Sequence, residues 1–313
     1  MWALACSSAP PAAPGCNTAG CVEEVYRREG ELYHGIQVDS SDVFWFELDA
    51  GPNSTTVSHV FGAPKNGGGP VRDLGPWSDY QASEALVIDD THVSFLAGDK
   101  LVRARKDGSQ RVELPVPEID RLDPGPLRDA GDAILVGGHA CKNLAWIPKN
   151  GSRPRIWSLS QEPMSGGDTG LEVDGPLYYC ASGHDVHVLD GTAQVRHLLH
   201  YEGKAGAMRF AGADLYWVDN DLAQLDRFAA GSDHAVAVGS TFERAAGLVF
   251  DRERGRLYWL TGLSEHGCTM GVYDLAAGRV SKLADDLDNW GPPAQDPDYI
   301  YFVAFHRVMR AHK

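Results

Sequence analysis

The chain has 313 residues, of which 43% are hydrophobic and 23% are charged, and its formal net charge is −15. This acidity argues against nonspecific binding to nucleic acid or to anionic lipid surfaces, because both need a basic face. Its 35 glycines and 18 prolines suit one turn-rich all-β domain, and no apolar run has the length needed to span a bilayer.

The N-terminal segment points to export. Residues 1–20 are rich in Ala and Pro, and Ala3-Leu4-Ala5-Cys6 resembles the end of a bacterial lipoprotein signal, although a basic n-region and a long apolar core are missing. We therefore expect residues 1–20 to be a signal remnant or lipoprotein linker, lipidated at Cys6, and the protein to lie in the cell envelope or to be secreted. A disordered cytosolic N-terminus is the alternative.

From residue 21 onward, a strand-like apolar segment recurs at a nearly constant interval. Its copies end at Trp45, Ser94, Leu135, Tyr179, Trp217, Trp259 and Tyr301. The intervals are 49, 41, 44, 38, 42 and 42 residues, a period typical of a propeller or a solenoid. Each period holds four short strands, which in the first repeat are Gly35 to Asp39, Asp42 to Leu48, Val57 to Ala63 and Pro70 to Leu74.

Two turn markers hold the register of the repeats. An Asp closes the first strand at Asp39, Asp89, Asp129, Asp174, Asp251 and Asp296, with Ala211 as the exception. A Gly-containing signal follows the third strand at Asn66-Gly67, Asp107-Gly108, Asn150-Gly151, Asp190-Gly191, Ala230-Gly231 and Ala277-Gly278. Asn-Gly and Asp-Gly favour type I′ hairpins, in which both central residues have positive φ. A calcium ring is one interpretation of the Asp set, but we favour turn capping, because each Asp lies beside a turn.

The two ends of the chain predict a closed ring. The seventh repeat stops at Lys313, where a hairpin turn would begin, so it lacks a fourth strand. Val22 to Arg27 lies before the first repeat and would supply that strand, leaving no sheet edge open. The sequence thus predicts an all-β, seven-bladed β-propeller of four-stranded blades over residues 21–313. Because the copies at Ser94 and Leu135 lack aromatics, six blades with an irregular insertion is the alternative.

Some repeats resemble known propeller sequences. Asp-Leu-Tyr-Trp-Val-Asp at 214–219 and Leu-Tyr-Trp-Leu-Thr at 257–261 resemble the YWTD-type repeat of receptor ectodomains. The frame Gly-Ile-Gln-Val-Asp at 35–39, with Val-Phe-Trp at 43–45 and a later Lys-Asn-Gly turn, is similar to uncharacterised secreted β-propellers of bacteria. The resemblance spans residues 21–313 and implies a propeller fold. It implies no single activity, and YWTD propellers have six blades where this sequence predicts seven.

Cysteine placement agrees with an oxidising compartment. Cys141 should open a third strand, and Cys180 should end the second strand of the next blade on the same face, which predicts a Cys141–Cys180 disulfide. Cys16 and Cys21 flank a small loop and form a second candidate pair. With Cys6 lipidated, one thiol would remain, at Cys268.

Histidines offer weaker metal alternatives. His139 and His184 could join Cys141 and Cys180 in a zinc site, but the spacing is not that of a known finger. The pairs His184/His187 and His197/His200 are each three residues apart on predicted strands, so their members should face opposite sides and be solvated or packed singly. We therefore expect no metal and no cofactor.

Any ligand site should lie at the channel mouth, because no Gly-x-Ser-x-Gly elbow, P-loop, His-Glu-x-x-His or dinucleotide glycine motif occurs. Alignment on the turn Asp gives the candidate ring His34, Glu84, Asp123, Asp168, Lys204, Arg244 and Trp290. This mixture suits a small polar ligand such as a sugar, a peptide terminus or an acid, and simple exposure is the alternative. Deeper in the channel, Gln37, Glu172 and Arg209 stand where other blades have Val or Ala, and an Arg209–Glu172 pair is expected.

Two functions from different classes fit these patterns. The favoured hypothesis is a non-enzymatic, monomeric binding scaffold, in the envelope or secreted, which presents a propeller face to a protein, peptide or glycan. The alternative is a calcium-dependent hydrolase or lactonase with its site in the central channel. Three or more acidic or amide side chains converging at the axis would favour the enzyme, and an axis lined by Val and Ala would favour the scaffold.

Overall fold

The computed structural model describes residues 18–28, 31–49, 57–77, 86–116, 126–138, 141–159, 169–182, 184–190, 195–201, 203, 205–261, 267–287, 291–304 and 306–313. Residues 1–17, including Cys6 and Cys16, lie outside them, so the predicted signal remnant and lipidation site stay predictions.

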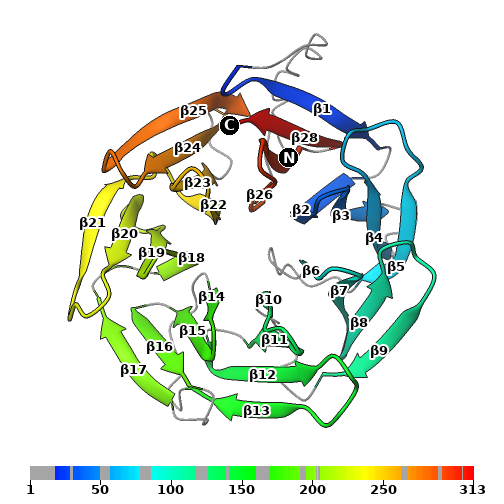
Figure 1. Ribbon diagram of the computed structural model, residues 1–313, viewed down its shortest axis with the longest axis horizontal. Coiled ribbons are helices and arrows are strands. Elements are labelled where there is room, and N and C mark those ends of the chain that lie inside the picture. The colour runs from blue at the N-terminus through cyan, green and yellow to red at the C-terminus, as the bar shows by residue number, and fades with distance from the viewer. Residues whose placement is uncertain are drawn as a thin grey trace, which may run out of the picture.

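Seven four-stranded antiparallel sheets stand around a central axis as propeller blades (Figure 1). Blade 1 contains β2 (Glu31–Val38), β3 (Asp42–Asp49), β4 (Val57–Pro64) and β5 (Arg72–Trp77). Blade 2 contains β6 (Leu86–Ile88), β7 (His92–Ala97), β8 (Lys100–Arg105) and β9 (Arg111–Pro115). Blade 3 contains β10 (Leu127–Asp129), β11 (Ala133–Gly137), β12 (Asn143–Pro148) and β13 (Arg155–Ser158).

The other four blades repeat this order. Blade 4 contains β14 (Thr169–Asp174), β15 (Leu177–Ser182), β16 (Asp185–Leu189) and β17 (Val195–His200). Blade 5 contains β18 (Ala205–Ala211), β19 (Asp214–Asp219), β20 (Gln224–Phe228) and β21 (Ala235–Ser240). Blade 6 contains β22 (Ala245–Asp251), β23 (Arg256–Thr261), β24 (Cys268–Asp274) and β25 (Arg279–Leu287). Blade 7 contains β26 (Ala294–Gln295), β27 (Tyr299–Ala304), β28 (Arg307–His312) and β1 (Val22–Arg27). The seven-bladed prediction is confirmed, and the two repeats without aromatics form complete blades.

The N-terminal strand closes the ring, as predicted. β1 pairs antiparallel with β28, from Val22 opposite Ala311 to Arg27 opposite Arg307, and Figure 1 shows the two strands side by side at the outer part of blade 7. The guanidinium of Arg310 also binds the Glu23 carboxylate across this pair. One blade is therefore built from both ends of the described chain, which removes an open sheet edge.

Two opposite faces follow from the antiparallel order within each blade. The turns between the first and second strands, and between the third and fourth, lie at one face, which we call the Asp face. The opposite face, which we call the entry face, is where the first and third strands of each blade begin and the second and fourth strands end.

The Asp-face hairpins differ from the predicted type I′ turns. Gly108 N donates to Arg105 O at 2.8 Å, and Gly151 N donates to Pro148 O at 3.1 Å. Gly108 and Gly151 have φ values of 80° and 77°, whereas Asp107 is not among the described residues of positive φ. A type I turn followed by a left-handed Gly, with a bulge, explains this pattern and still needs Gly for the last position.

The hydrophobic core is divided among the interfaces between neighbouring blades. One cluster joins Phe44 and Phe46 of blade 1 to Leu86 and Phe95 of blade 2, and every other pair of neighbours shares a comparable cluster. The aromatics that end the strongest repeats, Trp45, Trp217 and Trp259, are fully buried in these interfaces. The repeating Tyr-Trp signal thus marks second-strand residues that join one blade to the next.

No helix in the described part of the chain is long and apolar enough to cross a membrane.

Candidate functional site

Most of the turn Asp residues cap the Asp-face turns, as the favoured interpretation predicted. In blade 1, Asp39 Oδ1 accepts the backbone N–H groups of Ser41 and Asp42, each at 2.7 Å. Asp89, Asp251 and Asp296 accept two backbone N–H groups each in the same way. The side chain thereby replaces a backbone acceptor and fixes the first turn of the blade.

The second oxygen of each of these carboxylates binds a lysine from the following blade. The pairs are Asp39–Lys106 at 2.6 Å, Asp89–Lys149 at 3.1 Å, Asp251–Lys313 at 2.8 Å and Asp296–Lys65 at 2.6 Å. We call these eight residues the Asp–Lys belt. Burial opposes ionisation of Asp39, but the Lys106 ammonium and the turn N–H groups outweigh it and lower the pKa of this carboxyl. The belt ties neighbouring blades together at one face and occupies its repeated carboxylates.

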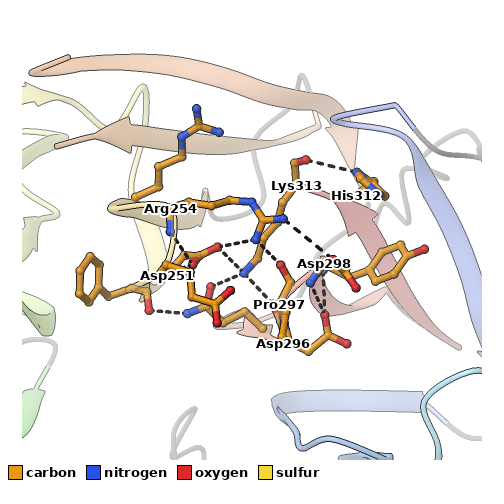
Figure 2. Close-up of polar contacts among 12 residues, drawn as sticks. Asp251, Arg254, Asp296, Pro297, Asp298, His312 and Lys313 are labelled. Carbon is orange, nitrogen blue, oxygen red and sulfur yellow. Dashed lines mark hydrogen bonds and ion pairs between the residues drawn. The ribbon is translucent and has the colours of Figure 1, made fainter. Parts of the chain in front are cut away.

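Lys313 has the most buried side chain in the belt, and Figure 2 shows the polar groups around it. Its side chain is 1% exposed and that of Asp251 is 5% exposed. The ammonium donates to Asp251 Oδ2 at 2.8 Å, Gln295 Oε1 at 2.9 Å and the Asp296 carbonyl at 2.6 Å. Arg254 approaches the same Asp251 oxygen at 3.2 Å. Three acceptors satisfy all three N–H donors of the ammonium, so this site holds blades 6 and 7 together and leaves no position for a ligand.

Charged side chains meet deeper in the channel wall. Glu172 Oε2 lies 3.3 Å from Arg209 Nη1, which confirms the predicted pair, and 3.4 Å from Arg128 Nε. These side chains come from the first strands of blades 3, 4 and 5 and are 14 to 19% exposed. Arg128 was not singled out, because it lies one residue before its turn Asp, whereas the candidate channel positions lie two residues before theirs. The single carboxylate therefore lies between two guanidinium groups, and the cluster carries one net positive charge.

Most of the predicted mouth ring lies outside the described residues. This applies to Glu84, Asp123, Asp168, Lys204 and Trp290, and His34 is described only as part of the β2 backbone. Arg244 is described and is exposed in the connection from β21 to β22, at the entry face. Whether these residues converge stays a prediction.

A polar cavity of about 560 Å³ opens on the entry face beside Arg244. It lies between blades 5 and 6 and is lined by Ser240, Phe242, Glu243, Gly267, Thr269, Lys282, Asp285 and Asp286. Lys282 Nζ lies 5.4 Å from the ring centre of Phe242 and 3.1 Å from Asp285 Oδ1. The cavity thus combines an aromatic face with hydroxyl, carboxylate and ammonium groups, which is the inventory that binds sugars or peptide termini.

Two residues of this cavity have unusual backbone conformations. Phe242 has φ of 71° and Asp286 has φ of 57°, which is the left-handed region that non-Gly residues rarely adopt. Such outliers gather at binding and catalytic sites, where the surrounding structure holds them. Nothing in the repeat pattern marked these positions, because both lie where the strands of blades 5 and 6 leave regular geometry.

A pair of buried carboxyl groups in blade 5 was also missed. Asp226 is 4% exposed and Asp219 is fully buried. Burial, reinforced by the nearby Asp219 charge, raises the pKa of Asp226 to about 6. Asp219 Oδ1 accepts two backbone N–H groups, while its Oδ2 receives no hydrogen bond from any described residue. Because Asp226 is buried and its pKa is raised, its first consequence is for the pH dependence of stability.

The cysteines largely follow the sequence prediction. Cys141 and Cys180 form a disulfide between blades 3 and 4 with a Cα–Cα distance of 5.8 Å, which removes the alternative zinc site on these two sulfurs. Cys21 is disulfide-bonded, and its predicted partner, Cys16, lies outside the described residues. Cys268 is a buried thiol.

The prediction that His197 and His200 face opposite sides is wrong. Asp185 pairs with His200 and His187 with His197 across β16 and β17, and the register shifts between these pairs. The shift adds one residue to β17, so a spacing of three acts as a spacing of two, and both histidines reach Asp185.

No protein-family model and no curated protein matches the chain. Among solved structures, it is similar to a catalytically inactive virginiamycin B lyase from Staphylococcus aureus with quinupristin, at 12% identity over 94% of this chain and 99% of that one, with a TM-score of 0.70. It is also similar to YCF48 bound to D1 peptide, at 10% identity over 97% of each chain and a TM-score of 0.64.

A nidogen/laminin complex supplies a further match, at 12% identity over 81% of this chain and 93% of that chain, with a TM-score of 0.54. These identities support the propeller fold alone. The neighbours include both an enzyme and binding proteins, so they leave the two function classes open.

Proposed function

We propose that the chain is a non-enzymatic binding scaffold, in the cell envelope or secreted, which presents its entry face to a protein, peptide or glycan. The observation that carries the proposal is the polar cavity between blades 5 and 6, where Phe242 and Asp286 hold left-handed backbone conformations. Repeated carboxylates on the Asp face are already paired with lysines, so recognition is assigned to the opposite face.

The channel wall supports a scaffold over a calcium-dependent hydrolase. Calcium takes six to eight oxygen ligands in proteins, whereas Glu172 is the carboxylate at the described channel positions and lies between two arginines. Arg128 and Arg209 both contact the Glu172 carboxylate and would repel a cation there.

Location outside the cytoplasm is part of the proposal. A disulfide that joins two blades, as Cys141–Cys180 does, persists in oxidising compartments and is rare in the cytosol. Lipid attachment at Cys6 would then fix the N-terminus to a membrane and leave the entry face available to partners.

The ligand class follows from the lining groups of the cavity. Phe242 offers an apolar face to a sugar ring or side chain, and the carboxylates of Glu243, Asp285 and Asp286 accept hydrogen bonds from hydroxyl or ammonium groups. A neutral glycan or an amine-bearing peptide therefore fits better than an anionic ligand.

The test is to screen the purified full chain on glycan and peptide arrays, and then to measure affinity for each hit by calorimetry. Lys282→Ala and Phe242→Gly should weaken binding at least about tenfold, the size of loss typical of a central contact. Arg279→Ala is the matched control, because Arg279 is exposed at the opposite end of the same strand. Ligands whose affinity is the same for the wild type and for both cavity variants would refute the site. Calcium-dependent ester or lactone hydrolysis that is lost in Glu172→Gln would favour the enzyme instead.

A further inference from the structure

Blade 4 brings a carboxylate and two imidazoles together on its outer strands. Asp185 begins β16, and His197 and His200 lie on β17, the outermost strand of the blade. Asp185 Oδ1 lies 2.9 Å from His197 Nε2 and 2.9 Å from His200 Nδ1. The three ligand atoms all lie within 4.8 Å of one another.

The register shift in β17 is what makes this cluster. On a regular strand, residues three apart point to opposite faces, so only one histidine could reach Asp185. Here Val186 pairs with Leu199 and His187 pairs with His197, so Leu198 is the extra residue. Bulges of this kind redirect side chains and are frequent beside functional sites.

These separations fit a shared metal ion. Zinc binds imidazole nitrogen and carboxylate oxygen at about 2.0–2.2 Å, so tetrahedral ligand atoms lie about 3.4 Å apart. The two Asp185–His separations of 2.9 Å are slightly shorter, and rotation of the exposed side chains can widen them. With 32%, 49% and 68% of the Asp185, His197 and His200 side chains exposed, an ion can enter directly from solvent.

We propose that Asp185, His197 and His200 bind a late first-row transition-metal dication, with Zn²⁺ as the reference ion. Two nitrogen ligands favour zinc, nickel or copper over calcium or magnesium, which prefer oxygen. Three protein ligands on an exposed strand leave coordination positions open to water or to a donor group of a bound partner.

Neighbouring histidines support the cluster. His184 Nδ1 donates to the Gly203 carbonyl at 2.7 Å, and the ring centre of His184 lies 6.0 Å from that of His200. The His187 ring lies 5.5 Å from that of His197. Two further imidazoles therefore lie next to the proposed ligands.

A metal-free role is the competing explanation, in which Asp185 is simply a hydrogen-bond acceptor for two rings. Both explanations start from the same contacts, 2.9 Å from Asp185 Oδ1 to each imidazole. Metal titration separates them.

The experiment uses the untagged full chain after chelator treatment and dialysis. Calorimetric titration with Zn²⁺ near neutral pH should show one equivalent bound at micromolar concentrations. His197→Gln and Asp185→Asn should each weaken binding by at least about tenfold, the usual cost of losing a group that holds a metal. Replacement by Co²⁺ should give visible absorption that is lost in the same variants.

The matched control is His234→Gln. His234 is also an exposed histidine paired with a carboxylate, that of Asp233 at 2.6 Å, but no second histidine among the described residues joins this pair. It should leave the Zn²⁺ affinity unchanged. The proposal is overturned if no stoichiometric Zn²⁺ binding occurs, or if binding survives in His197→Gln and Asp185→Asn. An equal loss in His234→Gln would likewise show nonspecific binding to surface histidines.

Discussion

Replacing Lys313 by Met should destabilise the protein more than any other lysine change in the Asp–Lys belt. The substitution keeps the length and apolar stem of the side chain but leaves the Asp251 carboxylate, 5% exposed, without its ammonium partner. Removing one member of a buried ion pair costs about 3–5 kcal/mol. Arg254 at 3.2 Å and two backbone N–H groups still bind Asp251, so we expect the lower end, about 3 kcal/mol.

Lys106→Met is the matched comparison. Lys106 makes the equivalent pair with Asp39 at 2.6 Å, but the two side chains are 17% and 15% exposed. Solvent screening reduces the value of such a pair to about 1 kcal/mol. Urea unfolding at neutral pH, followed by tryptophan fluorescence, gives both free energies of unfolding. The ranking by burial is refuted if the free energy of unfolding of Lys313→Met lies within about 0.5 kcal/mol of the wild-type value. It is also refuted if Lys106→Met is the more destabilising of the two variants.

Four further outcomes are expected. Lysine partners and turn N–H groups lower the pKa values of four belt carboxyls against the effect of burial, namely those of Asp39, Asp89, Asp251 and Asp296. Below pH 3.8 the unfolded state therefore binds more protons than the folded state. The urea midpoint should fall as acid is added through this range. Asp226, with its pKa raised to about 6, has the opposite sign, because its ionisation costs stability as pH rises. Asp226→Asn should therefore raise the free energy of unfolding by about 3 kcal/mol at pH 8 and much less at pH 4. Equal effects at both pH values would contradict the assignment. The Cys141→Ser/Cys180→Ser variant should lose about 4 kcal/mol of its free energy of unfolding, because the disulfide closes a loop of 39 residues. Peptide mapping of the wild type without reduction should find this bond, and free thiols at both positions would count against it. Deleting residues 1–30 removes β1 from β28 and should abolish the single cooperative transition, whereas a truncated chain that melts like the full one would refute closure by this strand.

The sequence predicted the blades well because each one depends on short-range signals. Three signals act within a few residues of their position: a left-handed Gly after the third strand, a capping Asp after the first strand, and an aromatic residue on the second strand. Even the weak repeats around Ser94 and Leu135 obey these signals, and both form complete blades. Closure by Val22–Arg27 was predictable for the same reason, since a missing fourth strand can be counted in the last repeat.

Contacts between repeats were harder to predict. Three hairpin lysines, Lys65, Lys106 and Lys149, bind the Asp of the preceding blade through their ammonium groups. Only the ring geometry specifies that partner. A signal existed in hindsight, because an Asp and a Lys recur at fixed positions in neighbouring repeats. Arg128 was missed for a related reason, since a long side chain one position from the expected one still reaches Glu172.

The histidine cluster shows a different limit. Strand alternation assigns side chains to faces only while the ladder is regular, and one extra residue at Leu198 reverses the assignment for everything beyond it. Nothing in the residues of β17 specifies that the bulge occurs there. The cavity beside Phe242 and Asp286 is unpredictable in the same sense, because it depends on irregular backbone between blades rather than on the repeat.

The pairing on the Asp face bears directly on the choice between scaffold and hydrolase. A ring of repeated carboxylates is the feature that first suggested calcium, which needs several oxygens converging on one point. In Asp39, one oxygen accepts turn N–H groups and the other binds Lys106, and the other belt carboxylates are engaged in the same two ways. Each carboxylate also belongs to a different interface between blades, so freeing one would not bring another to it. The regularity of the Asp set therefore reflects the assembly of the ring, and evidence about ligands has to be sought where the repeat is broken, at the entry-face cavity and the bulged edge of blade 4.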